Sequence, residues 1–96
     1  MLHLISQASA NQTLLQRTAT GDCLVFFGDA VFRLMSDTGF ALALAGEMNR
    51  VRVYALLPDL ETRGVEASEI PPGITLIGYD QLVALTVEEP VIQSWR

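Results

Sequence analysis

Residues 20–31, TGDCLVFFGDAV, hold the apolar run Leu24–Phe27 between residues that favour turns. Runs of this length that are rich in β-branched or aromatic residues and bounded by turn residues are typical of buried strands. Three further runs have the same character, and they span residues 2–5, 51–56 and 74–77. We therefore expect four buried strands.

The segments between these runs have the residue spacing of helices. After the first strand, Ser9 or Asn11 can cap a helix that stops before Gly21. The apolar face of this helix consists of Leu14, Leu15, Thr18 and Ala19. Further helices are expected over residues 29–35, 40–48, 58–64 and 81–89. Residues 40–48 are apolar nearly all round, which predicts that this helix is buried.

Strands that alternate with helices predict an α/β domain with a parallel sheet and right-handed crossovers. We expect a single three-layer α/β/α domain over residues 1–96, with four to five strands. The tail VIQSWR, residues 91–96, follows the last helix and can add a short edge strand.

Composition restricts the partners that this chain can have. Half of the 96 residues are apolar, which is more than one small core readily buries, so we expect an oligomer. The net charge is −5, and the six cationic residues are arginines scattered along the chain. Phosphate binding depends on clustered cations, so direct contact with nucleic acid is not expected.

The sequence also predicts a cytoplasmic location. One cysteine cannot form an internal disulfide. The first ten residues lack the basic region and apolar core of a secretion signal, and no apolar run is long enough to span a bilayer. We therefore expect no membrane partner.

Cys23, the single cysteine, is either a reactive sulfur centre or a small apolar residue at the root of a strand. It starts the second strand, and ligand sites of parallel α/β sheets form at the opposite, carboxyl edge. Its neighbour Asp22 disfavours the thiolate. A packed, unreactive Cys23 is the favoured interpretation, so no catalytic residue is assigned beyond Cys23 as a weak candidate.

Other polar residues are explained by structural roles. Asp29, Asp59 and Asp80 each begin a predicted helix, where a carboxylate caps backbone N–H groups. No second histidine or cysteine offers metal-ligand spacing to His3, which we expect to be a hydrogen-bonded structural or interface residue. The polar loop SQASANQT, residues 6–13, lacks a G-x-G-x-x-G motif, so neither a cofactor nor a metal is expected.

Five segments together resemble the TusB/DsrH family of small sulfur-relay subunits. They are MLHLI (residues 1–5), TGDCLVFFGDAV (20–31), VRVYALLPDLETRGV (51–65), ITLIGYDQLVALTVEEP (74–90) and QSW (93–95). The resemblance covers nearly the whole chain, in order, and is closer to TusB. No single segment is specific, and the combination carries the resemblance.

The resemblance implies a DsrE-like fold and assembly with two paralogous subunits, TusC-like and TusD-like, as a dimer of heterotrimers. Such a complex passes persulfide sulfur from a donor protein to an acceptor protein for 2-thiolation of the tRNA wobble uridine. The related DsrEFH complex handles sulfur during intracellular sulfur oxidation. In the Tus branch the persulfide cysteine belongs to the TusD-like subunit.

The sequence departs from the family at two places. The cysteine that DsrH-like chains carry in the first helix is matched here by Leu14, and relatives usually have glycine where this chain has Ala30. The resemblance therefore implies a non-catalytic subunit. The alternatives are a DsrH-type subunit in sulfur oxidation with Cys23 as a persulfide carrier and, more distantly, a small-molecule-binding module of flavodoxin-like shape.

Trp95 is the residue of the tail that most needs a partner. A large apolar ring near a chain end gains little unless something covers it. Trp95 is expected to be an anchor, either against this subunit's own sheet or at the contact with a partner subunit. The interface candidates are His3, Asp29 and Trp95.

Overall fold

A computed structural model describes residues 1–6, 12–36 and 38–95. Five parallel strands form one sheet in the order β4-β3-β2-β1-β5. The strands are β1 (Leu2–Ile5), β2 (Cys23–Phe26), β3 (Arg52–Leu56), β4 (Thr75–Ile77) and β5 (Ile92–Trp95). The predicted α/β class and parallel sheet are confirmed, and the tail supplies the fifth strand at an edge.

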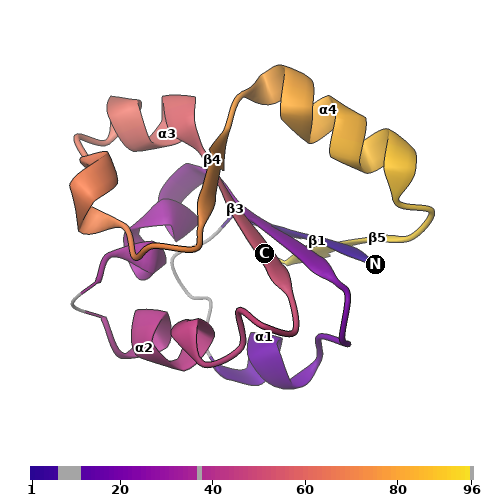
Figure 1. Cartoon of the computed structure of the whole chain (residues 1–96). Helices are drawn as coiled ribbons and strands as arrows, with labels where there is room; N and C mark the ends of the chain where they lie inside the picture. Colours follow the sequence, from indigo (N-terminus) through magenta and orange to yellow (C-terminus); the bar gives the residue numbers. More distant parts are fainter. Residues whose placement is uncertain (7–11, 37, 96) are drawn as a thin grey trace.

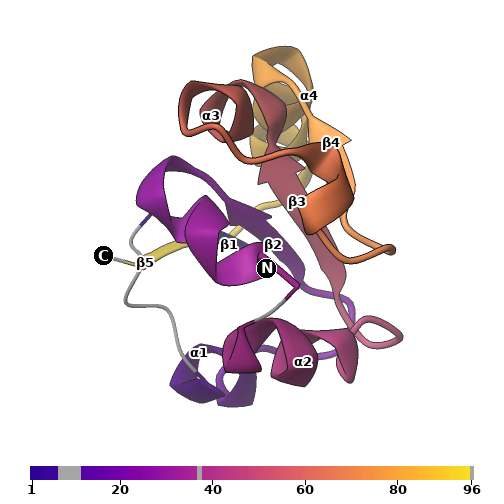
Figure 2. The same ribbon diagram turned by 90° about the vertical axis from the view of Figure 1, so that its left-hand side faces the viewer.

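Helices lie on both faces of this sheet. They are α1 (Gln12–Gln16), α2 (Gly39–Ala45), α3 (Leu57–Thr62) and α4 (Tyr79–Glu88), with two 3₁₀ helices, η1 (Gly28–Leu34) and η2 (Ala67–Glu69). Figure 1 shows α1 and α2 below the strands and α4 above them. The buried Leu60 of α3 packs in the same apolar cluster as α1, α2 and η1, so α3 covers their face of the sheet, whereas α4 covers the other face. The view turned by 90° in Figure 2 shows the same three layers.

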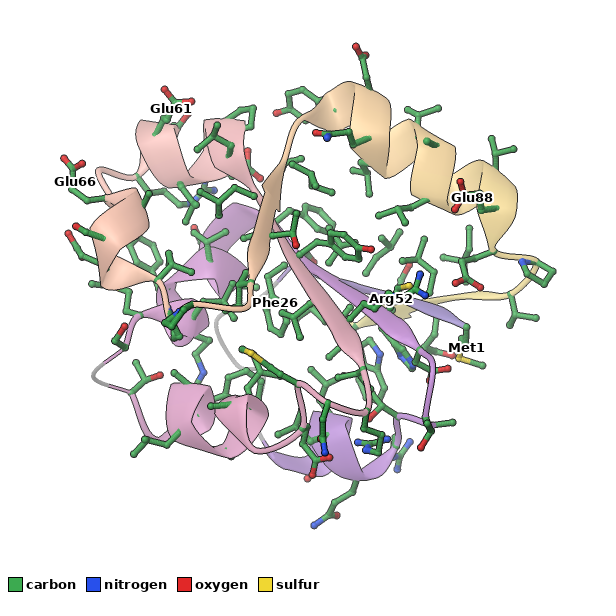
Figure 3. The ribbon with its side chains drawn as sticks, viewed as in Figure 1. Met1, Phe26, Arg52, Glu61, Glu66 and Glu88 are labelled. Atoms are coloured by element: carbon green, nitrogen blue, oxygen red, sulfur yellow. The ribbon has the colours of Figure 1, made fainter. Side chains whose placement is uncertain are left out.

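Alternate side chains of β1, β2, β3 and β4 enter two apolar clusters, one on each face of the sheet. Leu24 and Phe26 of β2 pack with α1, α2 and η1, and Phe26 meets Phe40 edge to face with ring centroids 5.9 Å apart. Figure 3 shows Phe26 inside the molecule. Cys23 and Val25 of the same strand enter the second cluster, against which α4 packs through Leu82 and Leu85. Strand β2 is therefore buried on both faces, as its unbroken apolar run indicates.

The turn from β2 into η1 approaches the end of β1 very closely. Gly28 has a φ of +56°, and a Cβ atom built on it would lie 3.1 Å from the carbonyl oxygen of Ser6. The Phe27 N–H donates to the carbonyl of Ile5 over 3.0 Å, which holds the two chain segments together. Only glycine readily meets both conditions, because other residues strain at this φ.

Several helix predictions need correction. The segment expected as an α-helix over residues 29–35 is the 3₁₀ helix η1, which Phe27 precedes in extended backbone. Its first N–H, from Gly28, donates to a side-chain oxygen of Asp59 at 2.6 Å. Asp59 thus caps a neighbouring element, and the predicted cap of its own helix is wrong.

The two other predicted aspartate caps also differ from the structure. Asp29 pairs with Arg63, and Gly78 precedes α4, where the Gln81 side chain accepts from the Gly78 N–H at 2.8 Å. Pro58 lies in the first turn of α3, and Gly64 follows this helix at φ +70°, both as expected. Ser9 and Asn11, the proposed caps of the first helix, lie outside the described residues.

Helices α1 and α2 bury less than the sequence predicts. Helix α1 ends at Gln16, so Ala19 lies beyond it and is exposed, although Leu14 and Leu15 are buried as expected. In α2 only Phe40, Ala41 and Leu44 are buried, and Leu42 is 74% exposed. The prediction that this helix is buried therefore holds for one face only. Among the described residues, no helix has the length and apolar character needed to cross a membrane.

Candidate functional site: a buried polar chain at the amino edge

Cys23 lies at the amino edge of the sheet, at the start of β2, and is 1% exposed. Its Sγ donates to Glu89 Oε1 over 3.5 Å. Figure 3 places Met1 and Arg52 on this side of the molecule, below the end of α4. Cys23 itself belongs to the second apolar cluster.

The surroundings of Cys23 disfavour its reactive form. Burial raises the pKa of the Cys23 thiol, and the adjacent Glu89 carboxylate raises the pKa further, whereas Arg52 opposes them. The thiolate is the nucleophile in persulfide chemistry, so a raised pKa and an inaccessible sulfur both reduce reactivity. The sequence gives the direction of this effect correctly but attributes it to Asp22, whereas burial and Glu89 are the causes.

His3 and Asp22 form a buried hydrogen bond at the same edge. His3 lies on β1 and is 1% exposed, and its Nε2 lies 2.8 Å from Asp22 Oδ2. The same Asp22 oxygen accepts the Ala19 N–H at 2.9 Å, and Asp22 Oδ1 accepts the α-amino group of Met1 at 3.1 Å. Asp22 therefore joins β1, the segment before β2 and the Met1 backbone.

Three hydrogen bonds hold Asp22 in its ionised form. Burial by itself would raise the pKa of Asp22, but the donors at Ala19, His3 and the Met1 ammonium outweigh it and lower the pKa to about 2. Hydrogen bonds to a carboxylate favour the charged form in this way. Sequence reasoning considered Asp22 only as a neighbour of Cys23 and missed this role.

Trp95 binds the other nitrogen of His3. Its indole Nε1–H donates to His3 Nδ1 over 2.9 Å, and the two ring centroids are 6.1 Å apart. In the register of β5 against β1, Trp95 pairs with Ile5, two residues from His3 on the same face. Trp95 is half-buried against the first apolar cluster, and the guanidinium of Arg17 lies 6.0 Å from its ring centroid.

These bonds define the tautomer of the imidazole. An indole N–H can only donate, so His3 Nδ1 must accept and carries no proton. The ring proton is therefore on Nε2, where it is donated to Asp22. Both nitrogens are satisfied within the chain, so His3 fits a structural role and is not positioned as a metal ligand.

The carboxyl edge of the sheet holds a second, exposed polar group. Arg63 Nε donates to Asp29 Oδ1 over 3.0 Å, and Asp29 is 69% exposed. The Tyr79 hydroxyl donates to Asp59 Oδ1 over 3.5 Å. These contacts tie η1, α3 and the start of α4 together. Within residues 1–6, 12–36 and 38–95, no three His, Cys, Asp or Glu side chains gather in a way that could hold a metal ion.

Apolar side chains are exposed along α4 and β5. Val83 and Val87 on α4 are 60% and 80% exposed, and Val91 and Ile92, which lead into β5, are 52% and 45% exposed. Of the predicted interface residues, His3 lies inside the chain, Asp29 lies at the surface of the carboxyl edge and Trp95 is half-buried beside β1. A contact of any of the three with a partner stays a prediction.

The fold and the buried amino edge define a small parallel α/β domain whose cysteine is packed in its interior. The sequence model of the DsrH family, described as "DsrH like protein", matches residues 6–91. The chain belongs to this DsrH-like family.

Individual relatives agree with this assignment. The chain is 36% identical to "Protein TusB" of Pectobacterium atrosepticum and 34% identical to "Protein TusB" of Pectobacterium parmentieri. Each match covers 99% of this chain and 100% of the relative. The resemblance to the TusB/DsrH family is thereby confirmed.

Two solved structures share the fold at low sequence identity. The protein of unknown function MTH1491 from Methanobacterium thermoautotrophicum aligns with a TM-score of 0.77 at 15% identity and covers 98% of this chain and 96% of its own. Protein Tm0979 from Thermotoga maritima aligns with a TM-score of 0.63 at 18% identity, over 93% and 94% of the two chains. These likenesses support the fold alone.

Proposed function

We propose that this chain is a non-catalytic subunit of a cytoplasmic sulfur-relay complex, a sulfurtransferase that supports 2-thiolation of the tRNA wobble uridine. Membership of the DsrH-like family and the TusB relatives support a role in sulfur relay. The observation that carries the non-catalytic part is the state of Cys23, which is buried at the amino edge with a raised thiol pKa.

The partners in this proposal are two paralogous subunits, TusC-like and TusD-like, arranged with this chain as a dimer of heterotrimers. The persulfide forms on a partner's cysteine, and sulfur donor and acceptor proteins meet the complex there. This chain completes the assembly and shapes the surface around that cysteine. The exposed apolar side chains along α4 and β5 support assembly, because obligate interfaces are rich in apolar surface.

A complementation experiment tests the non-catalytic role. A strain that lacks the gene is complemented with the wild-type chain, with Cys23→Ala or with empty vector, and 2-thiouridine in its tRNA is measured by mass spectrometry. We expect Cys23→Ala to restore thiolation to the wild-type level. Loss of thiolation in a variant that folds and still copurifies with its partners would contradict the proposal.

The alternative is a DsrH-type subunit of sulfur oxidation in which Cys23 carries persulfide. It needs an accessible thiolate, and neither the burial of Cys23 nor its raised pKa favours one. Intact-mass analysis of the complex after incubation with a persulfide donor distinguishes the two. An added sulfur atom on Cys23 supports the carrier role, and an unmodified Cys23 beside a modified partner cysteine supports the subunit role.

A further inference from the structure

The contact between His3 and Trp95 joins the first strand of the sheet to the last. The chain has one histidine and one tryptophan, and these two residues meet although 92 positions separate them. Strand β5 pairs with β1 alone, at the edge of the sheet, and its residues are exposed except for the half-buried Trp95. The bond from Trp95 to His3 therefore adds a side-chain anchor to an otherwise open edge strand.

This anchor depends on the protonation of one atom. His3 Nδ1 accepts the indole N–H of Trp95 over 2.9 Å, while Nε2 binds Asp22. A proton taken up from solvent can only go to Nδ1, because Nε2 already carries one. Nδ1–H then faces the Trp95 N–H, and two donors at this distance cannot form a hydrogen bond.

Among the groups that contact His3, Asp22 keeps its charge when the imidazole is protonated. Asp22 faces Nε2, and its lowered pKa of about 2 keeps it ionised at every pH where histidines ordinarily titrate. The Met1 ammonium binds Asp22 and lies 3.6 Å from Glu89 of the α4 side. Arg17 of the α1 side lies over the Trp95 ring. The attraction of an imidazolium to Asp22 holds the ring in place, so Trp95 is the partner that must move.

We propose that His3 and Trp95 form a proton-sensitive latch on β5. With His3 neutral, Trp95 is bound and β5 is held against β1. With His3 protonated, the indole loses its acceptor and the Trp95 end of β5 detaches, while the rest of the sheet stays folded. This device is independent of the proposed function, because it needs only the contacts of this chain.

Fluorescence of the single tryptophan of the 96-residue chain tests the latch. The emission maximum and acrylamide quenching of Trp95 are measured between about pH 7.5 and about pH 5, where histidines change charge. We expect the emission to shift to the red and quenching to increase as the pH falls, with an unchanged far-UV circular dichroism spectrum. A simultaneous loss of secondary structure would overturn the proposal, because the signal would then report global unfolding.

His3→Gln is the matched variant. A glutamine amide can donate to Asp22 and accept from Trp95, as neutral histidine does, but it does not titrate. The variant should keep the wild-type emission at about pH 7.5 and lose the pH response. A pH response equal to that of the wild type would overturn the latch.

Nitrogen NMR of the wild-type protein decides the question if that variant does not fold. At about pH 7.5 we expect the Nε2–H tautomer of His3, and on acidification the indole N–H signal of Trp95 should change together with the imidazole signals. Observation of the Nδ1–H tautomer would refute the latch, since Nδ1 could then not accept from Trp95. An indole signal that is indifferent to His3 protonation would refute it equally.

Discussion

Substitution of Asp22 by asparagine is expected to destabilise the fold by about 2 kcal/mol at neutral pH. The lowered pKa of Asp22, about 2 against an ordinary value of 3.8, measures how much the folded state prefers the ionised group. One pKa unit corresponds to about 1.36 kcal/mol, so the difference amounts to about 2 kcal/mol. The side chain is 9% exposed, so solvent screens these interactions little.

Asparagine cannot reproduce the bonds of the carboxylate although it has nearly the same size. Oδ2 of Asp22 accepts from both Ala19 N–H and His3 Nε2–H, and Oδ1 accepts from the Met1 ammonium. Either orientation of an asparagine amide turns its NH₂ group towards a donor. One orientation leaves the buried His3 N–H without an acceptor, which costs about 1–3 kcal/mol, and the other turns NH₂ towards the Met1 ammonium and removes the charge that binds it.

The same residue predicts how stability depends on pH. A carboxyl with a lowered pKa in the folded state stabilises that state fully above the pKa of the unfolded chain, near 3.8. This stabilisation is lost as the pH falls from about 4 through about 2. The wild type should lose stability across this window, and Asp22→Asn should lose less.

Urea unfolding provides the measurement, with free energies of unfolding taken at pH 7 and at steps down to about pH 2. Two protein concentrations are compared at each pH, because association would make the apparent stability concentration-dependent. Glu88→Gln is the matched control. It removes one exposed carboxylate from the last turn of α4 and should change stability by less than about 0.5 kcal/mol. An Asp22→Asn protein as stable as this control would refute the reasoning.

Four other perturbations follow from the packing. Cys23→Ala should cost about 1–2 kcal/mol in unfolding free energy, as for a small core truncation, and a larger loss would show that the thiol has a further role. The isolated chain should self-associate, whereas coexpression with both paralogues should give a soluble assembly; light scattering from a clean monomer would contradict this. Trp95→Ala should lower the melting temperature of the separated subunit, because it removes the donor to His3 and an apolar contact with the core. An unchanged melting curve would show that these contacts do not stabilise the subunit. Gly28→Ala should cost about 2 kcal/mol because of its positive φ and the nearby Ser6 carbonyl, while Gly39→Ala, with open space around it, serves as the neutral control.

The fold could be predicted because its signals are local. The apolar run of β2 indicates a strand buried on both faces, and its neighbours alternate with segments of helical spacing. Pro58 in the first turn of α3 and Gly64 after its end mark the start and the end of this helix, and both signals can be recognised from a few residues. Cys23 is the first residue of its strand, and in a parallel sheet this alone places it at the amino edge.

The polar chain of the amino edge could not be predicted in the same way. Its members are 19 and 92 positions apart, and only the pairing of β1 with both β2 and β5 brings them together. The predicted helix caps at the aspartates are wrong for a related reason. A carboxylate at the start of a helix can cap that helix, but Asp59, in the first turn of α3, accepts instead from Gly28 of a neighbouring element, so a tertiary contact overrides the local preference.

The order of strands in the sheet has a consequence for synthesis of the protein on the ribosome. Strand β1 emerges first but lies between β2 and β5, and β5 is the last strand to emerge. Until then the nascent chain presents β1 as an open edge, and an unpaired edge can recruit strands of other chains. Translation speed and chaperone occupancy before β5 is made therefore bear on how much of this protein reaches its folded state.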